Sequence, residues 1–239
     1  SSSSADDDTI GEVSTDDADD GGSSSGGAAD DGLPLHEAFT GDGGPWPSPW
    51  SAVGSAVLAA ELDDDRGRLS GSMGDVARMI LPGYEVVDLD ATVVVAFDDA
   101  SRQGIGFYAR QNGGVLHETE PPGQGYCVYV EGEGVANLGI WRELGGVEQL
   151  IAGVDSPIAG GIQAGVAYSL RLQIVQAGAT TELRTKMWRT DEPEPVAWAL
   201  EIEDGTPELQ DTAGSFAVDV YNYDGTGSVY FDDILVTAP

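Results

Sequence analysis

Three short runs of apolar and aromatic residues between Gly104 and Glu143 constrain the fold of this chain more than any other feature. The runs are GIGFYARQ, GYCVYVEG and NLGIWRE, and glycine-rich segments separate them. In the first two, side chains that suit a core alternate with side chains that mix aromatic rings and charge. A period of two residues is typical of β-strands that place one face on a core. We therefore expect neighbouring antiparallel strands here.

The second face of these strands is the first candidate for a binding surface. Aromatic rings and polar side chains together suit a partly exposed surface that recognises a ligand. The same alternation in the later run LRTKMWR adds three further residues of this kind. The candidate ligand-binding residues are Tyr108, Arg110, Tyr129, Glu131, Trp141, Arg184, Lys186 and Trp188. The alternative is that aromatic residues simply favour strands and that the basic residues pair with surplus acids.

The rest of residues 33–239 reads as a succession of short strands. VAYSLRLQIVQ has a regular alternation, and TELRTKMWR and PVAWALEI follow it. A turn with three consecutive aspartates, Asp63 to Asp65, is expected between two strands, and TPELQDT predicts a single helical turn. We expect Trp46 and Trp50, in a Pro/Gly-rich loop, to cap one end of a core. The pattern predicts an all-β fold, a two-sheet antiparallel β-sandwich of the jelly-roll type, as one domain.

Residues 1–32 differ from the remainder in composition. This segment consists mainly of Ser, Asp, Gly and Ala, and it contains no Lys or Arg. It cannot bury enough apolar surface to offset the entropy lost on ordering, so we expect a disordered acidic linker. Its composition resembles the tether of a bacterial surface lipoprotein, which suggests a lipid anchor upstream of residue 1 and a location at the cell surface or outside the cell.

The charge of the chain excludes some partners. Ten Lys and Arg residues stand against 42 Asp and Glu residues, giving a formal net charge of −32. A nucleic-acid-binding protein needs a basic surface, so nucleic acid is not an expected partner. The single cysteine, Cys127, excludes an internal disulfide and is expected to be a small residue in a sheet. No apolar run is long enough to span a bilayer as a helix.

Several of these runs together resemble the concanavalin A-like lectin/glucanase superfamily, and in particular the LamG-like jelly rolls of secreted bacterial proteins. The residues that carry the resemblance are HEAF…W, GFYARQ…GYCVYVEG…LGIWRE, YSLRLQ…LRTKMW and AGSFAVDVYNY…VYFDDILV. The resemblance covers about residues 33–239. It implies two curved antiparallel sheets, paired terminal strands, glycan binding on the concave face or rim, and often a structural calcium ion.

The resemblance also indicates where a calcium ion would bind. If the first and last strands pair, acidic residues from both would approach one another, and carboxylate oxygens are ligands that calcium prefers. The candidate metal ligands are Glu37, Asp42, Asp232 and Asp233. The alternative is that they are solvated acids at strand ends.

No catalytic residue is predicted. Laminarinase-type members of the superfamily carry Glu-x-Asp-x-x-Glu, whereas the most similar stretch here, Glu61 to Arg66, ends in arginine. Glu131 and Glu143 could face the same way on neighbouring strands, although a chance pair is expected in so acidic a chain. The resemblance therefore implies non-catalytic binding of a polysaccharide or glycoconjugate as the expected function. The alternatives are a glycoside hydrolase with unrecognised catalytic carboxylates, and a surface adhesion or assembly module that binds protein.

Overall fold

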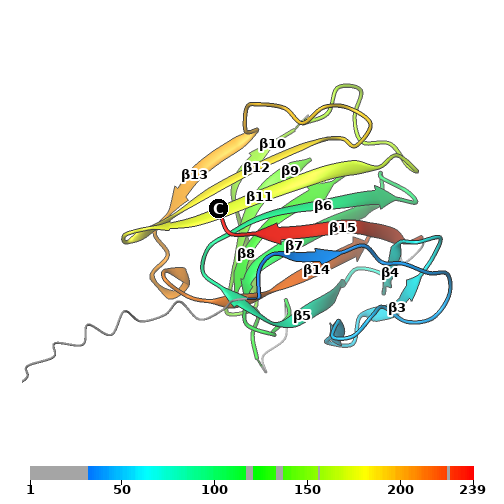
Figure 1. Ribbon diagram of the computed structural model, residues 1–239, viewed down its shortest axis with the longest axis horizontal. Coiled ribbons are helices and arrows are strands. Elements are labelled where there is room, and N and C mark those ends of the chain that lie inside the picture. The colour runs from blue at the N-terminus through cyan, green and yellow to red at the C-terminus, as the bar shows by residue number, and fades with distance from the viewer. Residues whose placement is uncertain (1–31, 117–120, 133–136, 156, 225–226) are drawn as a thin grey trace, which may run out of the picture.

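The computed structural model describes residues 32–116, 121–132, 137–155, 157–224 and 227–239. The described residues form two antiparallel sheets packed face to face (Figure 1). Apart from the strands they contain one short 3-10 turn, η1 (Pro207–Leu209), within the predicted segment TPELQDT. Residues 1–31 of the predicted linker lie outside this description. In the part of the chain that the structure describes, no helix is long and apolar enough to cross a membrane.

The first sheet, sheet A, contains the last strand of the chain near its middle. Its order is β13 (Leu200–Asp204), β12 (Thr180–Arg189), β11 (Tyr168–Ala177), β6 (Leu89–Phe97), β15 (Val229–Thr237), β4 (Gly67–Gly71) and β3 (Val57–Leu62). The first strand, β1 (Leu35–Glu37), also pairs with β15. The predicted pairing of the terminal strands is confirmed.

The second sheet, sheet B, is built around the stretch 104–143. Its order is β10 (Val147–Val154), β9 (Leu138–Leu144), β8 (Gly125–Glu131), β7 (Gln103–Gln111), β14 (Gly214–Asn222), β5 (Val76–Val86) and β2 (Ser51–Val53). The three runs that predicted neighbouring strands are β7, β8 and β9, and they pair in sequence order. The prediction of a two-sheet antiparallel sandwich is confirmed.

The core lies between the sheets and follows the predicted alternation. Strand β8 contributes Tyr126, Val128 and Val130 to the core, and all three are fully buried. The inward set of β11 also matches the prediction and consists of Tyr168, Leu170, Leu172 and Ile174. Because every second side chain of a strand points the same way, the alternate residues Tyr108, Cys127 and Tyr129 lie on the outer face of sheet B.

The hairpin turns use the residues that their backbone requires. Asp64 and Asp65, between β3 and β4, have φ of 53° and 56°, a pair of positive values typical of a two-residue hairpin turn. Gly145 and Gly146 connect β9 to β10 with φ of 63° and 73°. The triple-aspartate segment is therefore a turn, as predicted.

The Pro/Gly-rich loop between β1 and β2 closes one end of the core with two tryptophans. Trp46 and Trp50 are 5% and 7% exposed, and their ring centroids lie 5.4 Å apart in an edge-to-face arrangement. The Trp46 indole N–H donates hydrogen bonds to the carbonyl oxygens of Glu61 and Arg68, at 3.1 and 3.0 Å. The predicted capping role of this loop is confirmed.

Replacing Trp46 by alanine is expected to lower the free energy of unfolding by about 3 to 5 kcal/mol, because the change leaves a cavity beside Phe39 and Phe231. Chemical denaturation followed by circular dichroism measures this loss. Trp46→Phe is the control, since it keeps most of the packing and removes the two indole hydrogen bonds, and it should cost less. An alanine variant as stable as the wild type would contradict the assigned role.

Candidate functional site

The outer face of sheet B contains a cavity of about 450 Å³. Aromatic and acidic side chains from β7, β8, β9, β10 and β14 line it, together with residues that lead into β5. The lining residues are Gly74, Asp75, Val76, Tyr108, Leu116, Tyr129, Glu131, Trp141, Glu148, Asp219, Tyr221 and Tyr223. Four of the sequence-predicted ligand-binding residues lie together in this cavity, namely Tyr108, Tyr129, Glu131 and Trp141.

The Tyr129 ring lies across the adjacent strand where that strand has no side chains. The ring covers two glycines of β7, and a Cβ at Gly104 would lie 2.4 Å from the Tyr129 hydroxyl oxygen. A Cβ at Gly106, which pairs directly with Tyr129, would lie 2.9 Å from Tyr129 Cδ2. The two glycines therefore allow the ring to rest against the sheet, where it forms part of the floor of the cavity.

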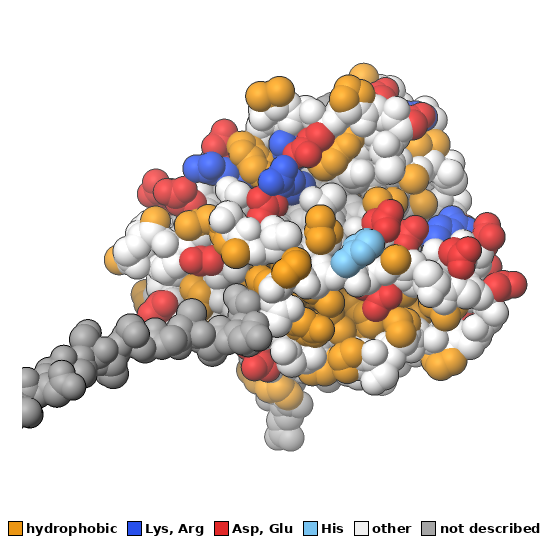
Figure 2. All heavy atoms as spheres, viewed as in Figure 1, with side chains coloured by type: hydrophobic (Ala, Val, Ile, Leu, Met, Phe, Trp, Pro, Cys, Tyr) orange, Lys and Arg blue, Asp and Glu red, His pale blue; other side chains and the backbone are white. Residues whose placement is uncertain are grey.

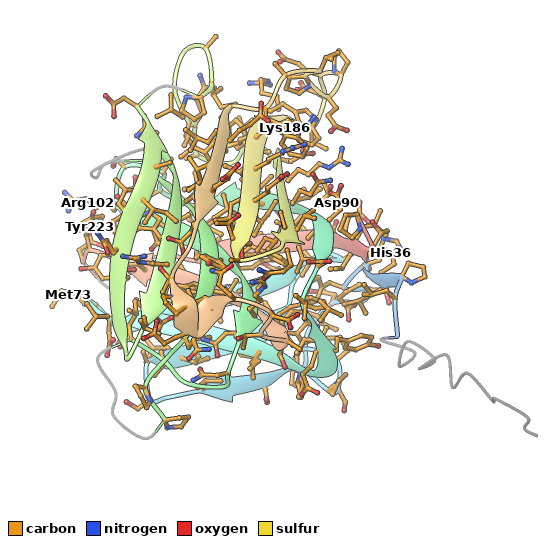
Figure 3. The ribbon with its side chains drawn as sticks, turned by 90° about the vertical axis from the view of Figure 1, so that its left-hand side faces the viewer. His36, Met73, Asp90, Arg102, Lys186 and Tyr223 are labelled. Atoms are coloured by element: carbon orange, nitrogen blue, oxygen red, sulfur yellow. The ribbon has the colours of Figure 1, made fainter. Side chains whose placement is uncertain are left out.

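A second ring is placed in the same way. A Cβ at Gly139 would lie 2.7 Å from Trp141 Nε1, so the indole extends over the glycine two residues earlier on β9. At the other side of the cavity Tyr221 and Tyr223 pack edge to face, with centroids 4.9 Å apart. Tyr223 is 43% exposed and lies at the surface near Met73 and Arg102 (Figure 3). The cavity is thus bounded by aromatic rings on two sides.

Beside the cavity lies a fully buried ion cluster centred on Arg78 of β5. Its guanidinium donates two hydrogen bonds of 2.7 Å to Asp219, its cross-strand partner on β14. It also donates to Glu143 Oε2 on β9 at 2.9 Å and to the Gly114 carbonyl at 2.6 Å. The Tyr108 ring packs 4.2 Å from the guanidinium carbon. One cation therefore joins three strands and a loop.

This contact shows that sheet B is strongly curved. In the strand order β5 and β9 are four steps apart, which corresponds to about 19 Å along a flat sheet. That separation exceeds what an arginine and a glutamate side chain can span together. Since Arg78 reaches Glu143 across the outer face, that face must be concave.

Glu143 is sealed under the loop that follows β7. Its side chain is fully buried, and a Cβ at Gly123 would lie 1.6 Å from its Oε1 atom. Oε1 has no hydrogen-bond partner among the described residues. Burial raises the pKa of Glu143 to about 7, because the loss of water outweighs the favourable charge of Arg78. Glu143 is therefore a carboxyl group beside the cavity that can bind a proton. Solvent does not reach this side chain.

Replacing Glu143 by glutamine is expected to flatten the pH dependence of stability. The folded state raises the pKa of this carboxyl from an ordinary 4.5 to about 7, so it binds the proton more tightly than the unfolded chain. The contribution of Glu143 to stability is therefore largest below the unfolded pKa and falls as pH rises through the folded pKa. Relative to Glu143→Gln, the wild type should lose up to about 3 kcal/mol between pH 5 and pH 8.

Urea denaturation of both proteins across this pH range measures the difference. Glu182→Gln, on the half-exposed outer face of sheet A, removes the same charge and serves as the control. Parallel pH profiles for the wild type and Glu143→Gln would contradict the raised pKa.

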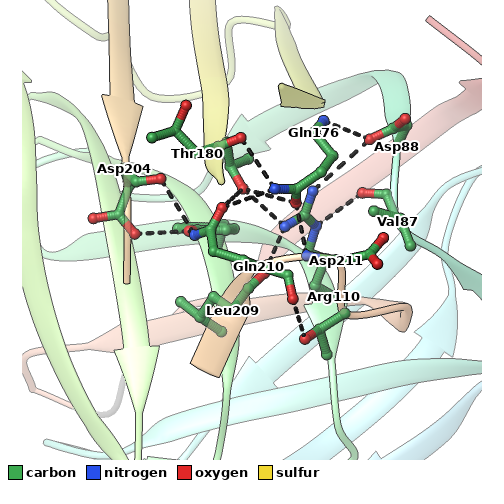
Figure 4. A network of polar contacts seen from close by, with 12 residues as sticks. Val87, Asp88, Arg110, Gln176, Thr180, Asp204, Leu209, Gln210 and Asp211 are labelled. Carbon is green, nitrogen blue, oxygen red and sulfur yellow. Dashed lines mark hydrogen bonds and ion pairs between the residues drawn. The ribbon is translucent and has the colours of Figure 1, made fainter. Parts of the chain in front are cut away.

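Arg110 does not join the cavity, contrary to the sequence prediction. A bulge at the end of β7 gives Arg110 a φ of 54° and turns its side chain to the edge of the core. There it donates hydrogen bonds to the carbonyls of Val87 and Leu209 and to the Thr181 hydroxyl (Figure 4). The guanidinium thus joins the two sheets and η1, which is a structural role.

Arg184, Lys186 and Trp188 also lie elsewhere, because β12 belongs to sheet A. Figure 3 places Lys186 on the opposite side of the sandwich from Tyr223. Lys186 is 5% exposed and pairs with Glu194 at 2.7 Å, and Arg184 pairs with Glu182 and Glu201. Figure 2 shows acidic and basic side chains side by side over this face. The expectation that these three residues share a binding surface with Tyr129 and Trp141 was wrong. Arg184 and Lys186 pair with acids instead.

Glu131 and Glu143 do not form a catalytic pair. Glu143 lies opposite Gly125 at the start of β8, and Glu131 lies at the end of β8. Six residues of extended strand separate the two positions by about 20 Å. Glycoside hydrolases hold their two carboxyl groups about 5 to 10 Å apart. This pair is therefore excluded as the two acids of such an enzyme.

The predicted metal ligands occupy the edge where β1 meets β15. Glu37 pairs with Ile234, which brings it near Asp232 and Asp233, as expected from the pairing of these strands. Glu37 accepts a hydrogen bond from the Phe39 amide, however, and Asp233 contacts His36. The described part of the chain contains no cluster of three or more His, Cys, Asp or Glu residues suited to a metal ion. The calcium site stays a prediction from sequence.

Sequence reasoning missed several residues around the cavity, among them Arg78, Glu148, Asp219, Tyr221 and Tyr223. Tyr221 and Tyr223 alternate in DVYNY, a pattern that could have placed both rings on the same side at the end of β14. Arg78 stands within the apolar run VARMIL, where a lone arginine signals a buried charge with partners. Which acids would be those partners depends on strand order, which the sequence does not reveal.

Comparisons with known proteins identify the fold. No protein-family model and no curated protein sequence matches the chain. Among solved structures, the carbohydrate-binding module CBM66 of Bacillus subtilis aligns with a TM-score of 0.53 and 11% identity, over 79% of this chain and 95% of that one. A β-1,3-1,4-glucanase (lichenase) derived from a mouse hindgut metagenome gives 0.55 and 10%, over 86% and 99%.

A third similar structure is the basic winged bean lectin with Tn-antigen, with a TM-score of 0.52 and 7% identity over 85% of this chain and 97% of that one. These proteins are concanavalin A-like jelly rolls. The chain has the concanavalin A-like jelly-roll fold. The suspected superfamily resemblance is confirmed at the level of the fold, and similar proteins include carbohydrate-binding modules, lectins and glucanases.

Proposed function

We propose that this concanavalin A-like jelly roll binds a polysaccharide or glycoconjugate, without cleaving it, in the cavity on the concave face of sheet B. The observation that carries the proposal is the placement of Tyr129 and Trp141 against glycines on the cavity floor. Sugar rings present C–H faces that pack on aromatic side chains, and their hydroxyl groups bond to polar neighbours such as Glu131. A volume of about 450 Å³ lies within the range of small-ligand sites and suits one or two sugar units.

The absence of a catalytic role is part of this proposal. Glu143, whose raised pKa would suit a general acid, is covered by Gly123 and does not line the cavity. The acidic linker supports a further element of the proposal, in which the domain is tethered by a lipid anchor and displayed outside a bacterial cell. Detection of the protein in the membrane fraction of its source, and its release by a protease, would test that location.

Trp141→Ala is expected to weaken glycan binding at least about tenfold, because it removes a large aromatic ring of the kind that contributes most to affinity at binding surfaces. Affinity electrophoresis against a panel of neutral polysaccharides measures retention. Trp188→Ala is the matched control, since Trp188 lies on β12 in the other sheet and should leave retention unchanged.

The same panel separates the alternatives. Release of soluble sugars during incubation would indicate a glycoside hydrolase. No retention on any glycan, combined with specific capture of an envelope protein, would indicate an adhesion or assembly module. Equal loss of retention in Trp141→Ala and Trp188→Ala would contradict the assigned face.

Calcium at the edge between β1 and β15 is a separate proposal, in which Glu37, Asp42, Asp232 and Asp233 supply oxygen ligands. A bound ion stabilises the folded state by mass action, so excess calcium should raise the melting temperature and a chelator should lower it. The double variant D232N/D233N should remove the calcium response. An identical melting temperature of the wild type with calcium and with chelator would reject the site.

A further inference from the structure

A second cavity lies at the side of the sandwich, where the edge strands of the two sheets meet. Cα atoms of β10 in sheet B and β13 in sheet A come within 8 Å of one another. Residues of both strands line a cavity of about 570 Å³, a volume within the range of small-ligand sites. None of the described residues that line this second cavity also lines the cavity around Tyr129 and Trp141, which is called the aromatic cavity below.

The β9–β10 hairpin forms the wall between the two cavities. Trp141 of β9 borders the aromatic cavity, and the next residue, Arg142, lines the second one. Consecutive side chains of a strand point to opposite faces, so the two residues face different spaces. Gln149 of β10 is the cross-strand partner of Arg142 and also lines the second cavity. A ligand in one cavity therefore contacts a different face of the hairpin from a ligand in the other.

The polar groups of the second cavity are held in place by a network that joins the two sheets. Arg142 donates hydrogen bonds to Asp204 Oδ1 at 3.0 Å and to the Thr206 hydroxyl. It also donates to Gln149 Oε1 at 2.6 Å. From the core, the Tyr126 hydroxyl donates to Asp204 Oδ2 at 2.7 Å, and Figure 4 shows this part of the network. Side chains that are already fixed lose little further entropy when a ligand binds.

The lining of the second cavity is electrically balanced. Among its described residues only Arg142 and Asp204 are charged, and their side chains are 28% and 11% exposed. Burial alone would raise the pKa of Asp204, but hydrogen bonds from Tyr126 and Thr206 outweigh burial and hold this pKa below its usual value. Asp204 therefore stays ionised and offsets the charge of Arg142, which leaves no net charge to attract an ion.

Donor groups next to apolar surface remain available to a ligand. The Arg142 Nε–H and the Gln149 amide N–H groups have no acceptor among the described residues, and Gln149 is exposed. Val147, which is 67% exposed, and Pro207 supply apolar surface from the two sides of the cavity. Sugar hydroxyl oxygens accept hydrogen bonds, and sugar C–H groups pack on apolar side chains, so these groups suit a neutral saccharide.

We propose that the second cavity is a second saccharide site, which takes one or two units of a neutral glycan and makes the domain bivalent. This site goes beyond the proposed function, because it shares no lining residue with the aromatic cavity. Sugar hydroxyl oxygens accept hydrogen bonds from Arg142 and Gln149, and Asp204 acts as a positioning residue that orients Arg142. No aromatic residue is among the described residues of the lining, so the second site binds more weakly than the aromatic cavity. Two sites on one domain increase retention on a polymer by avidity.

The test maps binding on the full chain by two-dimensional amide NMR, because the two cavities have separate reporters. Gly205 and Thr206 belong to the second cavity, whereas Gly104 and Gly106 lie under the Tyr129 ring. The probes are cellotriose, laminaritriose and triacetylchitotriose at up to about 10 mM, which detects millimolar affinity. We expect at least one of these neutral trimers to shift both pairs of amides, and the Gly205 and Thr206 signals to saturate at a roughly tenfold higher concentration.

Variants assign the second site without changing the first. Q149A removes an exposed amide donor and should weaken the affinity measured at Gly205 and Thr206 about fivefold, as expected for one hydrogen bond, while the Gly104 signal responds as in the wild type. Q163A is the matched control, because Gln163 is exposed on the loop before β11 and lines neither cavity. Equal affinities in Q149A and Q163A would overturn the second site.

The remaining outcomes separate this inference from the proposed function. Shifts confined to Gly104 and Gly106 would reject the second site and leave the proposed function standing. Shifts confined to Gly205 and Thr206 would support the second site and reject the aromatic cavity. If no neutral trimer shifts either pair, both are rejected. If the trimer of galacturonic acid shifts Gly205 and Thr206 at a lower concentration than every neutral trimer, Arg142 binds anions and the proposed ligand class is wrong.

Discussion

The buried ion pairs of Arg78 with Asp219 and Glu143 are the interactions on which the candidate site depends most. Arg78 is fully buried and holds carboxylates from two strands that are three steps apart in sheet B, as well as the loop carbonyl of Gly114. Removing one partner of such a cluster leaves an uncompensated buried charge, which typically costs several kcal/mol. The N–H groups of a guanidinium point in fixed directions. The hydrogen bonds that Arg78 donates therefore fix where the carboxylates of Asp219 and Glu143 lie. The cluster therefore ties β5, β14 and β9 together across the concave face.

The second constraint is the absence of side chains at selected positions. Gly104, Gly106 and Gly139 leave room on a surface where a Cβ would meet an aromatic ring at less than 3 Å. A glycine inside a strand weakens it, so such positions usually serve a close approach. Here they let the rings of Tyr129 and Trp141 lie against the sheet. The curved sheet and the rings that lie over glycines together form a hollow that is lined by both aromatic and acidic side chains.

The fold was predictable because alternation in β7, β8 and β11 assigns each side chain to a face without knowledge of the partners. The pairing of β1 with β15 followed only from the family resemblance. Strand membership was harder: β12 alternates as cleanly as β8, yet it lies in the other sheet, which separates Trp188 from Tyr129. Arg110 was misplaced because a single bulge reverses the side on which a residue points. The segment PVAWALEI forms a strand only from Leu200 onward, and Val196 is fully exposed.

The positions of β14 and β15 have a consequence for how the molecule is made. These two strands come last among the described strands, yet β14 lies between β7 and β5, and β15 lies between β6 and β4. While a ribosome extends the chain, each layer would lack an internal member until its final segment emerges. Earlier strands would keep unsatisfied edges, which are prone to pair with other molecules. Each sheet therefore reaches its full strand order only once β14 and β15 have been made, however early its other strands emerge.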